Sequence, residues 1–441
     1  MNTNKAFALV DVNNCYVSCE RFFQPALNGK ICVVLSNNDG CVIARSAEAK
    51  KAGIPMGMPY FKVQQVIKEQ KLDVKVLSSN YSVYAEMSRR FHNILASFVG
   101  PKESAIYSID EGFLDLTEHQ NTNLTQMGKE IREKVDRYIN LPVCVGIGRT
   151  KTEAKVANYI AKHYDVFGGV CNLIELAHVK DAFMWQMKVG DVWGVGRQYE
   201  KRLNTMGIEF AYQLMKANPE QIQKYFGVVL KRTVLELNGI SCLELDDTPE
   251  FKKQIRKANS FGVRVTELFD LKTAITRYTF DAHRRLRGEK LVCGTMYVFV
   301  STNPFDKEKP YFSNTHTASF PIATDDSQLL IKTANKLIEK VFVKGQEYKK
   351  CGVILTALTP KSSYNLDMFE DHETTEKSDA LMSAIDAVHK RYGVRTLGFG
   401  ASLMDGQKWT MKQAYKSQNY FTLKEMWSID DDHLRINRNR Q

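Results

Sequence analysis

Three carboxylates stand where two strands of one sheet are expected to meet. Asp11 ends an apolar strand (6–12), and Asp110 and Glu111 separate two alternating runs that predict a hairpin. Clustered carboxylates repel unless a cation neutralises them, and Mg²⁺ prefers one or two carboxylates with phosphate oxygens and water. Two such ions about 4 Å apart suit phosphoryl transfer, because they activate a hydroxyl and stabilise the leaving pyrophosphate. Singly, each residue also suits a turn or a cap.

A tyrosine and two basic sets accompany the carboxylates. Tyr16 lies one turn into the helix after Asp11, where its ring would clash with a ribose 2′-hydroxyl and select deoxyribose. Taken alone, a tyrosine there is more often part of the core. Near a metal site basic side chains hold a triphosphate, whereas most helix lysines only form a solvated face. One helix is expected to carry Arg45, Lys50 and Lys51, and another Lys151, Lys155 and Lys162.

Two further motifs suit contacts with other macromolecules. Gly194-Val-Gly196 has the form of a hairpin whose backbone N–H groups grip a DNA phosphate without reading sequence, and equally that of a plain helix-helix turn. Asn365-Leu-Asp-Met-Phe369 is a short apolar patch in an acidic stretch. It suits insertion into a pocket of another protein, or simple packing against the body of the chain.

The split β-α-β order occurs twice and positions these residues. The first copy is expected to have strands at 6–12, 31–36, 105–109, 113–116 and 143–147, and helices from 15 and over 81–98, 124–138 and 152–162. A helical unit to about 245 and a polar linker, 246–257, follow. The second copy is expected to have strands at 261–269, 291–301, 315–321 and 352–358, and helices at 271–286 and 328–343. A helix at 379–392 and a loose tail of the partner-binding kind end the chain.

The charge balance indicates a polyanionic partner. The 441 residues include 61 basic and 50 acidic side chains, a net charge of +11. Residues 251–360 hold 19 Lys and Arg against 10 Asp and Glu, so 19 minus 10 places +9 in one quarter of the chain. A soluble protein that is merely basic is the alternative.

Size and cysteine usage narrow the class of protein. At roughly 100 to 200 residues per domain, this length predicts several domains. The nine cysteines are scattered and never spaced as CxxC, which argues against a disulfide framework and a zinc site and favours a reducing cytoplasm. No apolar run reaches the roughly 18 residues that cross a bilayer, so no membrane partner is expected.

Together these motifs resemble the Y-family translesion DNA polymerases, and within them the UmuC type, the branch of the catalytic subunits of bacterial DNA polymerase V. The motifs occur in family order and are Ala8-Leu-Val-Asp-Val-Asn-Asn-Cys-Tyr16, Val33-Val-Leu-Ser-Asn-Asn-Asp-Gly-Cys-Val-Ile-Ala-Arg45, Tyr107-Ser-Ile-Asp-Glu-Gly-Phe113, Val145-Gly-Ile-Gly-Arg-Thr-Lys-Thr152 and Asp191-Val-Trp-Gly-Val-Gly196. The run from Ser36 to Arg45 is specific to the UmuC branch.

The resemblance implies an α+β, multidomain right-hand polymerase. Its parts are a split β-α-β palm (1–20 and 80–166), small fingers (21–79), a helical thumb with a helix-hairpin-helix (167–245), a β-α-β-β-α-β little finger (255–358) and a partner-binding tail (359–441). Implied ligands of two Mg²⁺ ions are Asp11, Asp110 and Glu111 with the Val12 carbonyl. Implied contacts of the dNTP are Val12, Asn13, Asn14, Cys15, Tyr16 as sugar gate, Arg45, Lys50 and Lys162; Gly194 and Gly196 would hold the duplex backbone.

The chain departs from the family pattern on the fingers side. Ala44, Ala47 and Lys50 stand where many members have Thr, Tyr and Arg, and Cys15 where an aromatic is common. A sliding-clamp contact is implied for Asn365, Leu366, Asp367, Met368 and Phe369, although Asn365 replaces the usual Gln.

The implied function is error-prone, template-directed DNA synthesis past damage in the SOS response. Small fingers leave little protein to check the nascent pair, so discrimination would rest on base pairing itself. Implied partners are primer-template DNA, a UmuD′-type dimer, a RecA-type filament and the clamp. Two alternatives stay open: a catalytically silent DNA-binding scaffold of a damage-response complex, and a palm-fold nucleotide cyclase, which explains neither the Gly194 hairpin nor the basic quarter.

Overall fold

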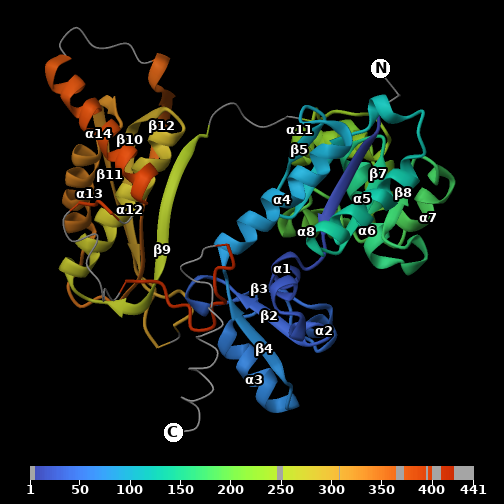
Figure 1. The fold of residues 1–441 in the computed structure, drawn as a ribbon, viewed down its shortest axis with the longest axis horizontal. Coiled ribbons are helices and arrows are strands. Elements are labelled where there is room, and N and C mark those ends of the chain that lie inside the picture. Colours follow the sequence, from blue (N-terminus) through green and yellow to red (C-terminus); the bar gives the residue numbers. More distant parts are fainter. Residues whose placement is uncertain are drawn as a thin grey trace. The chain divides into compact units, whose positions relative to one another are not determined.

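The chain forms two compact units (Figure 1), as seen in a computed structural model that describes residues 5–245, 252–306, 308–363, 372–393, 396–399 and 409–421. Unit 1 comprises Met1–Ser36, Gly40–Thr248 and Tyr415–Gln441, and unit 2 comprises Asn37–Asp39 and Pro249–Ala414. Each has its own hydrophobic clusters. In the described part of the chain, no helix has the length and apolar character needed to span a membrane.

A five-stranded sheet is the centre of unit 1. Its order is β5 (Ser104–Ile106), β6 (Glu111–Asp115), β1 (Phe7–Val12), β7 (Val143–Gly148) and β8 (Val170–Asn172). All neighbours are antiparallel except β7 and β8. Three helices pack on it: α4 (Tyr81–Val99), α5 (Leu124–Ile139) and α6 (Lys151–His163).

Alternation along β1 assigns its side chains to two faces. Ala8 and Val10 belong to the large core that includes residues of α4 and α5. Phe7 and Leu9 pack instead with Phe113 and with Ala154 of α6. Asp11 continues the Phe7–Leu9 face, so the pleat directs it toward α6.

A smaller three-stranded sheet is also part of unit 1. Its order is β3 (Val42–Arg45), β2 (Ile31–Leu35) and β4 (Val74–Ser78). The helices α2 (Ala47–Lys51) and α3 (Tyr60–Gln70) accompany it, and α1 (Cys15–Phe23) leads into it from β1. Its core is formed by Val33, Leu35, Val42, Ala49, Ile54 and Val63.

Short helices complete unit 1. They are α7 (Lys180–Met184), α8 (Arg197–Thr205), α9 (Ala211–Lys216), α10 (Pro219–Phe226) and α11 (Val228–Leu237), as the apolar pattern after Gly168 predicts. Their buried side chains share one cluster with Val156, Ala157 and Ile160 of α6, so the helical region packs directly on the helix beside Asp11.

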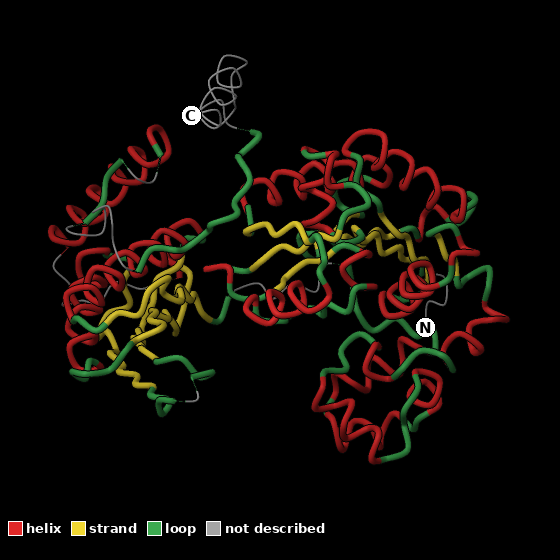
Figure 2. Tube along the Cα trace, turned by 90° about the horizontal axis from the view of Figure 1, so that it is seen from below, coloured by secondary structure: helices red, strands yellow, loops and turns green. Residues whose placement is uncertain are grey.

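Unit 2 has the element order β9 (Gln254–Val265), α12 (Leu268–Gly288), β10 (Leu291–Ser301), β11 (Ser313–Thr324), α13 (Ser327–Val341) and β12 (Tyr348–Pro360). The sheet order is β11-β10-β12-β9. Helices α12 and α13 lie against one face of this sheet (Figure 2), on Met296, Val298 and Val300 of β10. A further helix, α14 (His372–Tyr392), packs through Met382 and Ile385 onto Phe280 of α12.

Three local predictions were wrong. Arg45 lies in β3, not in a helix, because Arg45 itself pairs with Val33 of β2 and the N-cap Ser46 starts α2 only afterwards. Glu111 and Gly112 lie in β6 instead of the hairpin turn. Residues 254–257, expected as linker, already pair with β12 in β9.

The tail prediction also needs correction. The last helix begins at His372 instead of 379. Residues 409–421 are not a loose tail, since Trp409 donates a hydrogen bond to Thr273 over 2.7 Å and Tyr420 and Phe421 join the core of unit 1.

Candidate active site

Strand pairing brings the acidic residues to one end of the five-stranded sheet. Asp11 of β1 lies directly opposite Glu111 of β6. The backbone N–H of Val12 donates to the Asp110 carbonyl over 2.9 Å. Opposed residues of an antiparallel pair share a face, so Asp11 and Glu111 point to the same side of the sheet.

Ser108 forms the turn that leads into β6. Its hydroxyl accepts from the backbone N–H groups of Asp110 and Glu111 at 3.3 and 3.1 Å and contacts the Asp110 carboxylate at 2.5 Å. These bonds allow the turn to end at Asp110 and leave Glu111 free to pair with Asp11. The Ser-x-Asp spacing of Ser108 and Asp110 is the sequence signal for this turn.

Two lysines of α6 pair with these carboxylates. The Nζ of Lys162 lies 2.6 Å from Asp11 Oδ1, and the Nζ of Lys155 lies 2.8 Å from Glu111 Oε1. Seven residues, about two turns, separate the two lysines, so both project from one face of the helix. A pocket of about 250 Å³ lies here and is lined by both pairs together with Leu9, Val156, Asn158, Tyr159, Met187, Asp191 and Trp193.

Burial dominates the electrostatics of Asp11. Loss of water raises the pKa of its carboxyl to about 6, although the neighbouring Lys162 ammonium acts in the opposite direction. The nearby Glu111 and Asp110 carboxylates raise the pKa further. The Lys162 ammonium alone therefore does not offset the cost of burying the ionised Asp11 carboxylate.

An aromatic box surrounds Lys155. Its Nζ lies 4.3 Å from the ring centroid of Tyr107, 5.4 Å from that of Trp193 and 6.0 Å from that of Phe113. The Trp193 indole N–H donates to the Tyr107 hydroxyl over 2.9 Å. Trp193 belongs to the motif Asp191-Val-Trp-Gly-Val-Gly196, so this motif contacts Tyr107, which precedes the turn that carries the carboxylates. Neither Tyr107 nor Trp193 was predicted from the sequence as a neighbour of the site.

The turn between β1 and α1 lies next to the carboxylates. The backbone N–H of Asn13 donates to the Pro142 carbonyl over 2.8 Å, and the Asn13 carbonyl accepts from the Ser18 hydroxyl over 2.7 Å. Asn14 adopts the left-handed conformation (φ 50°) and begins α1 with Cys15 as its first residue. This turn therefore presents the backbone of residues 12–14 beside Asp110.

Tyr16 lies on α1 among other tyrosines. Its half-buried ring stacks on that of Tyr84 with centroids 4.4 Å apart and an interplanar angle of 11°, and meets Tyr81 edge-on at 6.0 Å. Burial raises the pKa of the Tyr16 phenol to about 12, so it is neutral at physiological pH.

The remaining predicted residues lie on other elements or outside the described residues. The Arg45 guanidinium donates to the Ile54 carbonyl, and Lys50 is exposed on α2. Gly194 has a φ of +89°, which favours glycine, and Gly196 caps the start of α8. Residues 365–369, the predicted clamp contact, lie outside the described residues.

The donor chemistry at the sheet end fits a hard divalent cation. Asp11, Asp110, Glu111 and the Val12 carbonyl offer only oxygen ligands, as Mg²⁺ prefers. Among the described residues, no three Asp, Glu, His or Cys side chains already converge as a metal cage. Asp11 and Glu111 hold lysine ammonium groups instead.

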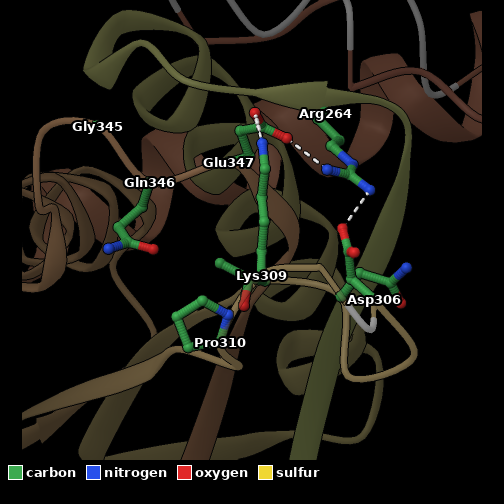
Figure 3. Close-up of a pocket in the computed structure, with 9 residues that line it drawn as sticks. Arg264, Asp306, Lys309, Pro310, Gly345, Gln346 and Glu347 are labelled. Atoms are coloured by element: carbon green, nitrogen blue, oxygen red, sulfur yellow. Dashed lines mark hydrogen bonds and ion pairs between the residues drawn. The ribbon is translucent and has the colours of Figure 1, made fainter.

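The charge of unit 2 is distributed unevenly over its surface. Figure 3 shows a pocket in which Arg264 pairs with Asp306 at 2.7 Å. Arg264 and Lys309 both pair with Glu347 there. Two cations meet two carboxylates there, so this pocket adds nothing to the positive excess.

The sheet face opposite α12 and α13 is different. It carries Tyr297 and Phe299 of β10, and exposed Arg256 of β9 lies with its guanidinium 4.8 Å from the Phe299 ring centroid. An exposed arginine held over an aromatic ring suits contact with a phosphate backbone.

The chain matches known families along most of its length. Residues 10–159 match the impB/mucB/samB family, 252–368 its C-terminal domain, 180–208 the IMS family HHH motif and 379–428 a domain of unknown function. Protein UmuC of Salmonella typhimurium is 41% identical over 94% of this chain and 98% of its own length. Protein SamB, also of Salmonella typhimurium, is 40% identical over 94% and 97%.

A solved structure with the same fold is a Y-family DNA polymerase chimera of Dbh and Dpo4. It has a TM-score of 0.64, is 19% identical and covers 80% of this chain and 99% of its own. At this identity the likeness concerns the fold alone. It confirms the fold class that the sequence predicts, an α+β, multidomain polymerase fold with a split β-α-β palm.

Proposed function

The chain belongs to the impB/mucB/samB family and is a Y-family DNA polymerase of the UmuC type, and on this premise we propose that it performs error-prone translesion DNA synthesis in the SOS response. The reaction is template-directed transfer of a deoxynucleotide to a primer 3′-hydroxyl. The observation that carries the proposal is the β1–β6 register, which sets Asp11 opposite Glu111 and Asp110 beside Val12, next to two lysines of α6.

The proposed ligands of two Mg²⁺ ions are Asp11, Asp110, Glu111 and the Val12 carbonyl. Bound there, Mg²⁺ supplies neutralisation of the triphosphate and a lower pKa for the attacking hydroxyl. The raised pKa of Asp11 supports this role, because a carboxylate that is costly to ionise in a buried place gains most from an added cation.

The lysines of α6 act on the triphosphate. Lys162 and Lys155 neutralise Asp11 and Glu111 in the free enzyme. Both ammonium groups lie beside the proposed metal ligands, where they would bind the phosphate oxygens of the dNTP. The Tyr16 ring excludes a 2′-hydroxyl from the sugar site, and residues 12–15 line the sugar and phosphates. Arg45 and Lys50 would reach the nucleotide only from the fingers side.

The parts of the chain divide the other tasks. We propose palm (1–20 and 80–166), fingers (21–79), thumb (167–245), little finger (255–358) and tail (359–441) as in the family. Gly194 and Gly196 hold the duplex backbone, and the basic little finger follows the DNA through residues such as Arg256. Residues 365–369 bind the sliding clamp, and a UmuD′-type dimer and a RecA-type filament act with the chain in the cytoplasm.

The test is primer extension on intact and abasic templates by the full chain with its proposed partners. Asp110→Ala should abolish extension, whereas Asp115→Ala, at the far end of β6, should retain it. Equal extension by wild type and Asp110→Ala contradicts the metal-site assignment. DNA binding without extension in every combination of partners would favour the alternative, a catalytically silent scaffold.

A further inference from the structure

A short C-terminal segment packs on unit 1 close to the proposed sugar site. Residues 415–421, the strap, fall within the match to a domain of unknown function (379–428) and belong to unit 1. The strap is part of the red stretch drawn beside β4 and the start of α4 in Figure 1. The Ser78 N–H donates to the Tyr415 carbonyl over 3.0 Å, and the Tyr415 N–H donates to the Ser78 hydroxyl over 3.0 Å.

Aromatic contacts hold the other end of the strap. Tyr420 stacks on Phe23 at the end of α1, with centroids 4.2 Å apart and an interplanar angle of 5°. Phe421 meets Phe23 edge-on at 5.4 Å, and the guanidinium of Arg90, on α4, lies 4.9 Å from the Phe421 ring centroid. The strap therefore joins α1 to α4, the two helices that carry Tyr16 and its neighbours.

At the middle of the strap, Ser417 enters a buried polar network. The Asn80 side-chain amide donates to the Ser417 hydroxyl over 3.0 Å, and that hydroxyl donates to Glu20 Oε1 over 2.9 Å. Tyr84 donates its hydroxyl to the same carboxylate oxygen over 2.8 Å. Asn80, Glu20 and Tyr84 are fully buried, so losing one partner weakens the hydrogen bonding of a buried polar group.

The network leads directly to Tyr16. Glu20 lies one turn after Tyr16 on α1, and Tyr84 both donates to Glu20 and stacks on the Tyr16 ring. The order of contacts is Ser417, Glu20, Tyr84, Tyr16. Rotation or displacement of Tyr84 would break either its hydrogen bond or its stacking, so the strap and the tyrosine ring constrain each other.

We propose that the strap is a positioning element of the polymerase site, which fixes the ring of Tyr16 through Ser417, Glu20 and Tyr84 and thereby sharpens the choice of deoxyribose over ribose. The proposal rests on the proposed role of Tyr16 as sugar gate. It assigns a task to part of the domain of unknown function: residues 415–421 complete the support of Tyr16, which is otherwise built from Glu20, Asn80 and Tyr84.

The experiment compares single-nucleotide incorporation of dNTP and rNTP by the full chain with its partners. Ser417→Ala and Tyr84→Phe each remove one hydroxyl group that donates to the Glu20 carboxylate, and each keeps the rest of the substituted side chain. Each should lower the ratio of kcat/KM for dNTP to that for rNTP by about tenfold, mainly through a lower KM for rNTP, while kcat for dNTP stays within about twofold.

Three controls separate positioning from general stability. Ser417→Thr keeps the hydroxyl and should restore the wild-type ratio. Tyr60→Phe removes a 3.1 Å contact between the Tyr60 and Tyr415 hydroxyls, also on the strap but outside the Glu20 network, and should leave the ratio unchanged. A chain ending at residue 421 should have the wild-type ratio, whereas a chain ending at residue 414, which lacks the strap, should have a lower ratio.

Tyr16→Ala in the same assay separates the two proposals. An unchanged ratio in Tyr16→Ala overturns the role of Tyr16 and the inference with it. A lowered ratio in Tyr16→Ala, combined with wild-type ratios in Ser417→Ala and Tyr84→Phe, overturns the inference alone. An equal loss of kcat for both nucleotides, without a change in the ratio, also contradicts it, since that pattern indicates a purely structural strap.

Discussion

Replacing Asp11 by Asn should stabilise the metal-free protein in neutral solution, although the change removes an ion pair. Asp11 lies 2.6 Å from Lys162, and its side chain is only 13% exposed. Burial nevertheless raises the pKa of its carboxyl from 3.8 to about 6, so the cost of burial exceeds the gain from the lysine. Asparagine has nearly the same shape as the protonated carboxyl and avoids this cost.

The size of the effect follows from the pKa shift. A folded-state pKa above the unfolded value means that the folded protein holds the proton more tightly, so wild-type stability falls as pH rises from about 4 to beyond 6. Two pKa units correspond to about 3 kcal/mol at pH 8, where Asp11 is ionised in both states, and to less than about 1 kcal/mol at pH 4.

Thermal melting in EDTA at pH 4 and pH 8 measures the effect. Asp11→Asn should melt several degrees above wild type at pH 8 and close to it at pH 4. Glu118→Gln, a change at an exposed carboxylate, should match wild type at both pH values. An Asp11→Asn protein that is less stable than wild type at pH 8, or a difference that does not depend on pH, would refute the reasoning, because the ion pair would then outweigh burial.

Three other predictions concern packing, the sugar site and DNA. A Cβ added at Gly146 of β7 would overlap the backbone of Asn158 and Ala154 on α6. Gly146→Ala should therefore lower the free energy of unfolding by about 3 kcal/mol or more and lower the melting temperature. Gly196→Ala, with no atom within 4 Å of the added Cβ, should leave the melting temperature unchanged. Tyr16→Ala should raise ribonucleotide incorporation by about tenfold or more in single-turnover kinetics, and unchanged incorporation would remove the sugar gate. Arg256→Ala should lower the slope of log K against log salt for DNA binding by about one in fluorescence-anisotropy titrations; an unaltered slope would mean that Arg256 does not reach a phosphate.

Local patterns in the sequence determined the elements and their order. Apolar alternation and helical spacing are properties of neighbouring residues, so β1, α4, β7 and both split β-α-β copies follow from the sequence within a few residues. The position of Asp11 at the end of β1 follows in the same way. The misplaced turn before Glu111 shows the limit, because strand register depends on the partner strand as well as on local turn residues.

Only the tertiary structure decided which side chains meet across the chain. Ser417 and Glu20 are separated by 397 residues and Trp193 and Tyr107 by 86, and no local periodicity relates them. In the sequence, Lys155 and Lys162 are compatible with a solvated face of their helix. The tertiary packing places that face against the carboxylates. A sequence gives the type of each side chain but not its burial. Burial arises only when distant segments pack together and exclude water. The raised pKa of Asp11 and the proposed role of the strap both depend on that packing.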